Sequence, residues 1–298
     1  MKVPAAYIGV VLIASTTPLA VQWSGNGPGF LFSTSSRIAL SAVLAVILVS
    51  VLRLPMSWSR NACYSYLAAG LGIFCSMLAV HWSAQYIPSG WIAVIFGLAP
   101  ISTGMMAVLW LDEPPLTIAK LAGIALGIGG LIVIFGQGAT LSKETLYGVC
   151  GMLLAVLSRS ASAVWIKRIH EPLNGLVLTT GGLLIATPLF LLLWFGTGNI
   201  WPDEIGDRAA ASIIYLAVFA TLISFALYYY LLRTIDLTRV ALITLISPVC
   251  ALLLGMQLNN ETVSLSVWIG TLLILSGLVC FEFDEKIAPK LKRIRESN

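Results

Sequence analysis

Long apolar stretches separated by short polar segments run through the whole sequence. Ten of them are long enough to cross a bilayer as helices, which requires roughly 20 residues each. They are expected at residues 4–24, 31–52, 61–81, 88–110, 116–136, 146–167, 173–195, 209–231, 238–258 and 264–283. Inside hydrocarbon every backbone polar group must be bonded within the protein, which favours helices over open sheets. The pattern therefore predicts an all-α integral membrane protein with ten transmembrane helices.

Part of this pattern occurs twice, at residues 93–113 and 241–261. The matched residues are Ala93 with Ala241, Ile95 with Ile243, Pro100 with Pro248, Glu113 with Glu261 and, after a deletion of one residue, Gly123 with Gly270 and Gly130 with Gly277. Two halves with five spans each must be inverted relative to one another, because an odd number of spans starts and ends on opposite sides. Paired proline-interrupted spans in two halves are typical of a transporter's binding site.

The expected organisation is therefore two inverted five-helix repeats. They comprise residues 1–136 and 146–283, with a linker at 137–145 and a basic tail at 284–298. The composition agrees with a membrane environment, since charged residues make up 10% of the chain, against roughly 25% in soluble domains. A signal peptide is the alternative for the first span, but nine further spans favour an uncleaved helix.

The basic residues set the expected orientation. With the N-terminus inside, thirteen of the 17 Lys and Arg residues lie on the inner side, two on the outer side and two within spans. The inner residues are Lys2, Arg53, Arg60, Lys120, Lys167, Arg168, Arg233, Arg239, Lys286, Lys290, Lys292, Arg293 and Arg295. Basic residues collect on the cytoplasmic side, so both termini are expected in the cytoplasm and the chain in the inner (plasma) membrane. The linker is then outside, and the tail either lies along anionic headgroups or is a solvated end.

The sequence resembles the EamA family of the drug/metabolite transporter superfamily. The resemblance rests on the two Pro-x12-Glu blocks that begin at Pro100 and Pro248, and more weakly on Pro18 and Arg37. It implies ten helices in two inverted repeats, cytoplasmic termini, and export of amino acids, related metabolites or drugs. Arg159 departs from the family pattern, where an uncharged or aromatic residue is expected.

Arg159 is the leading candidate for contact with a substrate. It lies near the middle of the sixth span, where an ionisable residue is a functional candidate by default. A guanidinium can hold a carboxylate through two parallel hydrogen bonds. Ser158, Ser162 and Trp165 share a helical face beside it and are candidates with it. The alternative is a structural role, in which the arginine satisfies helix-end carbonyls or a hydroxyl.

Arg37 is the second ionisable residue inside a span. Ser33, Arg37 and Ser41 occupy one face of the second span, nearer its outer end. Contact with substrate and snorkelling to the outer headgroups are both open for this side chain.

Further candidates are aromatic, amide and hydroxyl side chains. Near span ends, an interfacial aromatic belt is the alternative role. For polar residues within a span, hydrogen bonding between helices is the alternative. These candidates are Gln22 and Trp23 in the first span, His81 and Gln85 at the end of the third, and the stripe of Thr221, Ser224 and Tyr228 in the eighth.

Three prolines are expected to act as hinges: Pro18, Pro100 and Pro248. A proline inside a helix removes a backbone donor and frees a carbonyl one turn upstream. A freed carbonyl at membrane depth is tolerated only against protein or a water-filled cavity.

These features favour a carrier that exports small amphiphilic metabolites by alternating access. Amino acids or close derivatives are the first candidates, and cationic drugs are the alternative. A passive channel and an accessory membrane scaffold are the alternatives from other classes. The cysteines have no metal-ligand spacing and the spans have no carboxylate pair, so no metal, cofactor or enzymatic activity is expected. The expected partners are a small-molecule substrate and membrane lipids, without nucleic acid, and the chain is expected to be a monomer or homodimer.

Overall fold

The computed structural model describes residues 3–111, 116–136, 142–198, 201–235 and 237–296. Every regular element in these residues is a helix. Nine helical stretches among them are long and apolar enough to cross a membrane, and a further apolar helix at Leu265–Phe281 is shorter. The predicted all-helical, multi-pass architecture is confirmed, whereas the count of ten spans and the inversion of the two halves stay predictions.

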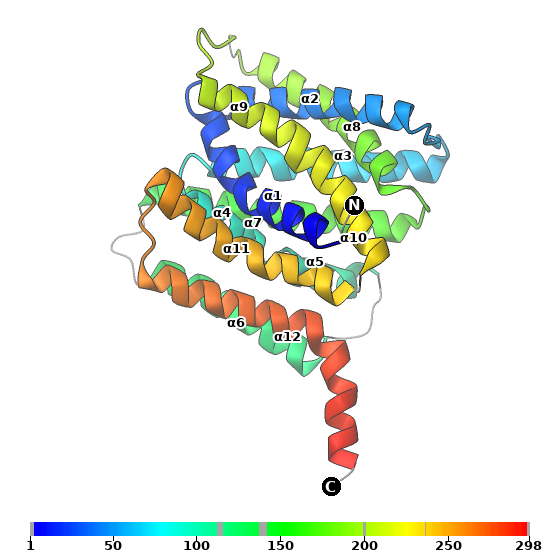
Figure 1. Cartoon of the computed structure of the whole chain (residues 1–298), viewed down its shortest axis with the longest axis vertical. Coiled ribbons are helices and arrows are strands. Elements are labelled where there is room, and N and C mark those ends of the chain that lie inside the picture. Colours follow the sequence, from blue (N-terminus) through cyan, green and yellow to red (C-terminus); the bar gives the residue numbers. More distant parts are fainter. Residues whose placement is uncertain (1–2, 112–115, 137–141, 199–200, 236, 297–298) are drawn as a thin grey trace.

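The helices lie side by side across the view in Figure 1, and α6 and α12 form a pair along its lower edge. The elements are α1 (Val3–Gly25), α2 (Phe30–Val51), α3 (Arg60–Ser83), α4 (Ser89–Phe96), α5 (Ala99–Trp110), α6 (Ile118–Gly136), α7 (Lys143–Ile169), α8 (Gly175–Gly196), α9 (Asp207–Tyr215), the π-helix η1 (Leu216–Ile223), α10 (Ser224–Thr234), α11 (Leu237–Asn259) and α12 (Leu265–Glu296). The end of the bundle at which α1 begins is termed the first end, and the end at which α1 stops is termed the second end.

Serine side chains at the polar junctions fix where two of these helices begin. The Ser59 hydroxyl accepts a hydrogen bond from the Ala62 N–H at 3.0 Å, before α3. The Ser142 hydroxyl accepts one from the Thr145 N–H at 3.1 Å, before α7. Such caps satisfy N–H groups that lack partners in the first turn of a helix. The cap at Ser142 starts α7 three residues earlier than the predicted 146.

The predicted fourth span is broken in two rather than continuous. It comprises α4 and α5, which are separated by Gly97 and Leu98. Pro100 cannot donate to the Phe96 carbonyl, and Phe96 is the last residue of α4. Pro100 itself lies in the first turn of α5, where a missing N–H costs little. The hinge predicted at Pro100 is therefore a junction between two helices at residues 97–98.

The predicted eighth span also departs from a regular α-helix. It runs through α9, the π-helix η1 and α10. The Thr221 hydroxyl donates to the carbonyl of Leu216, five residues earlier, at 3.1 Å. The i→i+5 bonding of a π-helix widens the turn, so side chains beyond it no longer follow the α-helical spacing assumed from the sequence. Short π-helices of this kind are frequent at functional sites.

The backbones of α6 and α12 approach each other closely because glycines lie at the contacts. A methyl group on Gly123 would stand 2.6 Å from the carbonyl oxygen of Gly277, and one on Gly130 would stand 2.5 Å from that of Gly270. Small residues permit such contacts between membrane helices. The same four glycines are matched between the halves of the sequence, and they meet crosswise, as a two-fold axis between the two helices would place them.

The last helix is longer than the predicted tenth span. α12 continues past the predicted boundary at residue 283 and ends at Glu296. The segment predicted as a separate tail is therefore helical as far as that residue, while its side chains lie outside the described part of the chain.

Candidate substrate cavity

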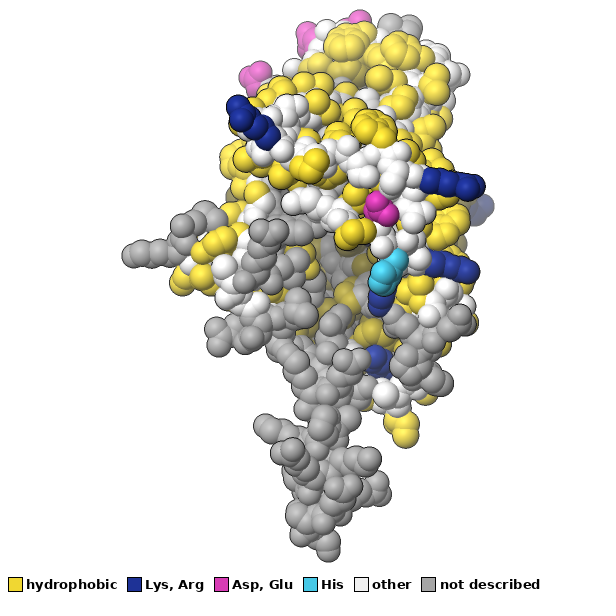
Figure 2. Space-filling model, turned by 90° about the vertical axis from the view of Figure 1, so that its right-hand side faces the viewer, with side chains coloured by type: hydrophobic (Ala, Val, Ile, Leu, Met, Phe, Trp, Pro, Cys, Tyr) yellow, Lys and Arg dark blue, Asp and Glu magenta, His cyan; other side chains and the backbone are white. Residues whose placement is uncertain are grey.

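A cavity of about 520 Å³ lies inside the bundle. Residues of α1, α2, α3, α4, α7, α8, η1 and α11 line it. Its wall extends to Ile166 and Gly175, near the end of α7 and the start of α8, which places its opening at the first end. Figure 2 shows a hollow in this face of the molecule, with a histidine and basic side chains beside it. The volume lies within the range of about 300–1,000 Å³ that is usual for small-molecule sites.

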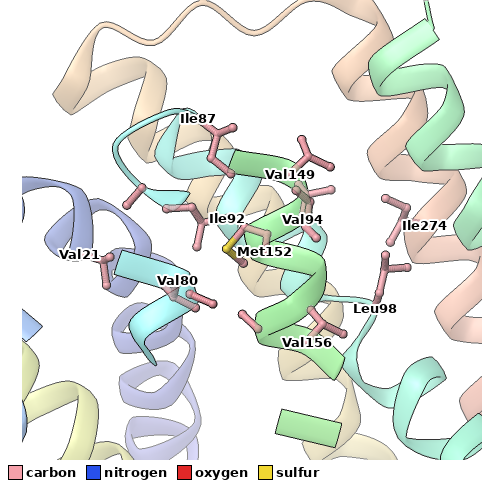
Figure 3. Close-up of a cluster of buried hydrophobic side chains, with 14 of the residues drawn as sticks. Val21, Val80, Ile87, Ile92, Val94, Leu98, Val149, Met152, Val156 and Ile274 are labelled. Carbon is pink, nitrogen blue, oxygen red and sulfur yellow. The ribbon is translucent and has the colours of Figure 1, made fainter. Parts of the chain in front are cut away.

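Apolar side chains close the cavity toward the second end. Val21, Val80 and Ile92 belong both to the cavity wall and to a cluster of buried side chains. Figure 3 shows this cluster, in which Val149 and Met152 of α7 pack with residues of the neighbouring helices. Met152 is 0% exposed, so no gap remains beside it. The cluster is the floor of the cavity.

A polar network lies at the second end. The Glu261 carboxylate accepts hydrogen bonds from the backbone N–H and the hydroxyl of Ser89, at 3.0 and 2.7 Å, and from the Gly90 N–H at 3.3 Å. The Asn259 amide donates to Glu261 at 3.0 Å and to the side-chain oxygen of Gln22 at 2.9 Å. The carboxylate also meets the positive end of the α4 dipole. The network therefore ties together α1, the start of α4 and the α11–α12 connection.

Trp23 extends this network to the α9 helix. Its indole N–H donates to the side-chain oxygen of Asn259 at 3.0 Å. The guanidinium of Arg208 lies 3.7 Å from the centroid of a Trp23 ring, a cation–π contact. Gln22 and Trp23 were predicted to contact substrate, but neither lies in the cavity wall. Both instead hold the second end closed.

Arg159 lies in the cavity wall. It forms the lining face of α7 together with Ser162, Ala163 and Ile166. In the described part of the chain it has no hydrogen bond or ion pair. A charged residue at the centre of a span costs roughly 2.5–3.5 kcal/mol on insertion scales. The guanidinium is therefore available to a ligand in the cavity.

Arg37 also lies in the wall, on α2, and is 6% exposed. Its Nη1 lies 3.2 Å from Nε2 of His81, on α3, and its Nε is buried without a hydrogen-bond partner. The side chain therefore does not snorkel to the headgroups. His81 lies in the last turn of α3, as predicted, but it is 1% exposed and so supports Arg37 from within the protein.

Hydroxyl groups provide much of the remaining polarity of the wall. The Ser162 hydroxyl donates to the carbonyl of Ala68 at 2.9 Å, and so links α7 to α3. The Ser41 hydroxyl donates to that of Thr221 at 3.3 Å, and so links α2 to η1. Ser162 and Thr221 thus link helices as well as lining the cavity. The hydroxyl-bearing wall residues are Thr17, Ser162, Thr179, Thr221, Thr244 and Ser247.

Two of the three predicted hinge prolines reach the cavity. Pro18 lies inside α1 and Pro248 inside α11, and both are wall residues. α1 and α11 pack against each other. Each proline therefore interrupts the hydrogen bonding of its helix at the cavity. Pro100 is not a wall residue, although Phe96 and Gly97, at the helix break before it, are.

Besides Gln22, Trp23 and His81, five predicted candidates lie outside the cavity wall: Ser158, Trp165, Gln85, Ser224 and Tyr228. The lining residues of α7 are Arg159, Ser162, Ala163 and Ile166, and Trp165 lies outside this set and is 55% exposed. Gln85 donates to the carbonyl of Trp82, three residues earlier, at 3.1 Å. The π-helix shifts the phase of the eighth span, so Ser224 and Tyr228 do not continue the stripe from Thr221.

The wall is basic. Its described residues include Arg37 and Arg159 but no Asp or Glu. No group of three or more His, Cys, Asp and Glu residues in the described part of the chain could hold a metal ion. The arrangement suits a ligand with negative charge, because a carboxylate could form charge-assisted hydrogen bonds with either guanidinium.

The network at the second end could not be recognised from the sequence. There Glu261 was only the repeat partner of Glu113, which lies outside the described residues, and neither Asn259 nor Ser89 was a candidate. One signal was present, since Pro88 and Ser89 directly precede an apolar stretch and serine is common at helix starts. Nothing in the sequence places Glu261 beside Ser89, because the two are 172 residues apart.

A sequence model of the EamA-like transporter family matches residues 3–136 and 146–282. The chain belongs to this family. The resemblance drawn from the Pro-x12-Glu blocks is thereby confirmed, and the protein is a multi-pass membrane transporter of the EamA type.

The relatives align with this EamA protein over most of its length, but at low sequence identity. It is 23% identical over 281 residues to the uncharacterized transporter YoaV of Bacillus subtilis, which covers 93% of this chain and 96% of that one. It is 26% identical over 254 residues to an uncharacterized transporter of Archaeoglobus fulgidus, covering 82% of this chain and 85% of that one. A crystal structure at 19% identity matches with a TM-score of 0.66 over 94% of this chain and 97% of that chain, which shows the shared fold.

Proposed function

We propose that this EamA protein is an inner-membrane carrier that exports small amphiphilic metabolites bearing a carboxylate, with amino acids or close derivatives as its substrates. The observation that carries the proposal is Arg159, which has no partner in the described chain and lies in the wall of a cavity of small-molecule size. A guanidinium holds a carboxylate through two hydrogen bonds, and the apolar wall accommodates the rest of an amphiphilic molecule.

The transport cycle proposed is alternating access. The cavity is reached from the first end, while the apolar floor and the Glu261 network close the second end. Carriers expose a central site to one side at a time, and interrupted helices such as α1 and α11 allow the rearrangement. A passive channel would instead need a continuous path through both ends.

The proposed export direction rests on the family resemblance, and the charges at the first end support a cavity that faces the cytoplasm. Arg53, Arg60, Lys167 and Arg168 are all located there, at the ends of α2, α3 and α7. The positive-inside rule makes this the cytoplasmic side. A cavity open to the cytoplasm is where an exporter loads its substrate. A cationic drug would meet two guanidinium groups and no described carboxylate, so the cavity gives the cationic alternative no support.

Reconstituted proteoliposomes test the carrier. A thermal-shift screen of the purified chain against amino acids, N-acetyl amino acids and cationic dyes first identifies a ligand, since ligands raise stability by mass action. The best ligand is then radiolabelled, and its uptake is measured into vesicles preloaded with the same unlabelled compound. We expect saturable uptake that accelerates with preloading. Uptake that rises linearly with concentration and ignores preloading would indicate a channel instead.

Variants of Arg159 test the substrate class. Arg159→Lys keeps the positive charge but loses the planar guanidinium that can form two parallel hydrogen bonds. It should weaken the binding of a carboxylate ligand by about 1–3 kcal/mol. Arg159→Gln should weaken it further and leave a cationic ligand unaffected. Arg60→Gln is the matched control, because Arg60 is exposed outside the cavity. Equal carboxylate binding by the wild type and both Arg159 variants would make Arg159 a structural residue.

A further inference from the structure

The proposed function leaves one charged group in the cavity unexplained, the guanidinium of Arg37. It is almost fully buried although it lies in the wall, and its Nε has no hydrogen-bond partner. Such a group is costly, because a buried charge needs a counter-charge and its donors need acceptors. The described wall residues include no carboxylate to supply either.

His81 positions Arg37 but does not neutralise it. Arg37 can donate only to a ring nitrogen that carries no proton, so the imidazole accepts at Nε2 and is neutral, with its proton on Nδ1. That Nδ1 atom is also buried without a partner. Because the arginine keeps its full charge, the pair is a preformed cationic group at the cavity wall.

Arg37 and Arg159 reach this one cavity from different helices, α2 and α7. Both α2 and α7 pack against α3, which holds the two helices in place around the cavity. Apolar side chains such as Ile38, Met77 and Phe96 supply much of the wall. The cavity thus offers two positive groups and a nonpolar lining.

We propose that Arg37 and Arg159 form a two-point anion site, and that the substrate is an organic dianion with two carboxylates on a nonpolar body. The proposal rests on the proposed function, which assigns the first carboxylate to Arg159. It narrows the substrate from amino acids in general to acidic metabolites with two carboxylates. A zwitterion would bring its ammonium group among two guanidiniums, whereas a dianion offsets both charges.

A series of four probes that share one phenylethyl skeleton tests the charge preference. The probes are phenethylamine (a cation), phenylalanine (a zwitterion), N-acetylphenylalanine (a monoanion) and phenylsuccinate (a dianion). Their affinities for the purified full chain are measured at pH 8 by calorimetry and thermal shift. We expect phenylsuccinate to bind about tenfold or more tighter than N-acetylphenylalanine, the ratio that one additional charge-assisted hydrogen bond provides. Phenethylamine should bind weakest.

Variants then assign the second carboxylate to Arg37. Arg37→Gln should reduce phenylsuccinate affinity by about tenfold or more and change that of N-acetylphenylalanine by less than about threefold. Arg37→Lys should restore part of the loss, and Arg60→Gln should change neither affinity. Retained binding of N-acetylphenylalanine shows that Arg37→Gln is folded. If that variant does not fold, the order of the four probe affinities for the wild type decides whether the two-point site is correct.

The outcomes separate this inference from the proposed function. If phenylsuccinate and N-acetylphenylalanine bind equally, or if folded Arg37→Gln binds phenylsuccinate like the wild type, the two-point site is wrong while the carboxylate at Arg159 stands. If Arg159→Gln binds every anion like the wild type, the substrate class in the proposed function is wrong. Tightest binding of phenethylamine, or no binding of either anion, overturns both.

Discussion

Glu261 holds the second end closed through four donors. Its carboxylate accepts hydrogen bonds from two groups of Ser89, from the Gly90 N–H and from Asn259. Hydrogen bonds to a charged group are stronger than neutral ones, and these connect the α11–α12 segment to the first turn of α4. Opening of the second end requires this carboxylate to leave its donors.

Replacement of Glu261 by glutamine should loosen the second end. The amide keeps the shape of the side chain but loses the charge, so closure should weaken by about 1–3 kcal/mol. The readout is chemical labelling of the variant Ala163→Cys, whose new thiol lies in the cavity wall. The five native cysteines of this chain are first replaced by serine. An impermeant maleimide should label the new thiol only from the first end with Glu261 present, and from both ends in Glu261→Gln.

Glu204→Gln is the control for this experiment. Glu204 is exposed in the segment before α9, and none of the hydrogen bonds of the network involves it. Its replacement removes the same charge near the same end, and labelling should remain restricted to the first end. An identical labelling pattern for Glu261→Gln and Glu204→Gln would show that the carboxylate does not control closure.

The interrupted helices are the elements most suited to movement. α1 and α11 each contain a proline in the cavity wall, α4 and α5 meet at a break, and η1 is a π-helix beside the cavity. Backbone hydrogen bonds are missing or rearranged at each place, so these elements can bend without breaking regular turns. The continuous helices α2, α3 and α7 hold the two arginines and His81.

Pro248→Ala should slow transport more than Pro100→Ala. An alanine at 248 restores an N–H within α11 at the cavity wall and should stiffen that helix. At position 100 the new N–H could donate to the Phe96 carbonyl, but Pro100 lies in the first turn of α5 and outside the cavity wall, so the effect on transport should be smaller. Expression of both variants should be normal, and counterflow rates in proteoliposomes compare them. Transport at the wild-type rate in both variants would contradict a hinge role for either proline.

Glycine contacts hold the α6–α12 pair together. Gly130→Ala places a methyl group 2.5 Å from the Gly270 carbonyl oxygen, so the helices must separate. We expect a loss of about 1–3 kcal/mol in stability, the usual cost of overpacking, seen as a lower melting temperature in detergent. Gly129→Ala is the matched control, because a methyl group there meets nothing within 4 Å. Equal melting temperatures for the two variants would mean that the close contact is not needed.

At the scale of the whole molecule, the two ends differ in both access and charge. The first end has the opening of the cavity and most of the described basic residues, whereas the second end is closed by the apolar floor and the Glu261 network. If the predicted orientation holds, the opening of the cavity faces the cytoplasm.

A reporter enzyme that is active only outside the cytoplasm tests this orientation. Fused after residue 298, it should be inactive, because both termini are predicted to be cytoplasmic. The same reporter fused within the 137–145 linker should be active and serves as the positive control. Strong activity of the C-terminal fusion would overturn the orientation and, with it, the proposed direction of transport.

Much of the fold could be predicted because hydrocarbon leaves the chain few choices. An apolar stretch of roughly 20 residues has to become a helix whatever it packs against, so the positions of the spans follow from the sequence. Arg159 could be singled out in the same way, since a charge within a span is rare and costly. The family could be read from the repeated Pro-x12-Glu blocks, which are local in sequence.

Only the tertiary structure decided which side of each helix faces the cavity. Spans that are apolar on all sides have no polar face to show which side is buried, so the lining face of α7 was predicted around Ser158 and Trp165 rather than around Ala163 and Ile166. The tertiary structure also brought His81 to Arg37, and Glu261 to Ser89. Such pairs join residues far apart in the chain, and packing rather than local propensity determines them, whereas the spans themselves depend on the solvent alone.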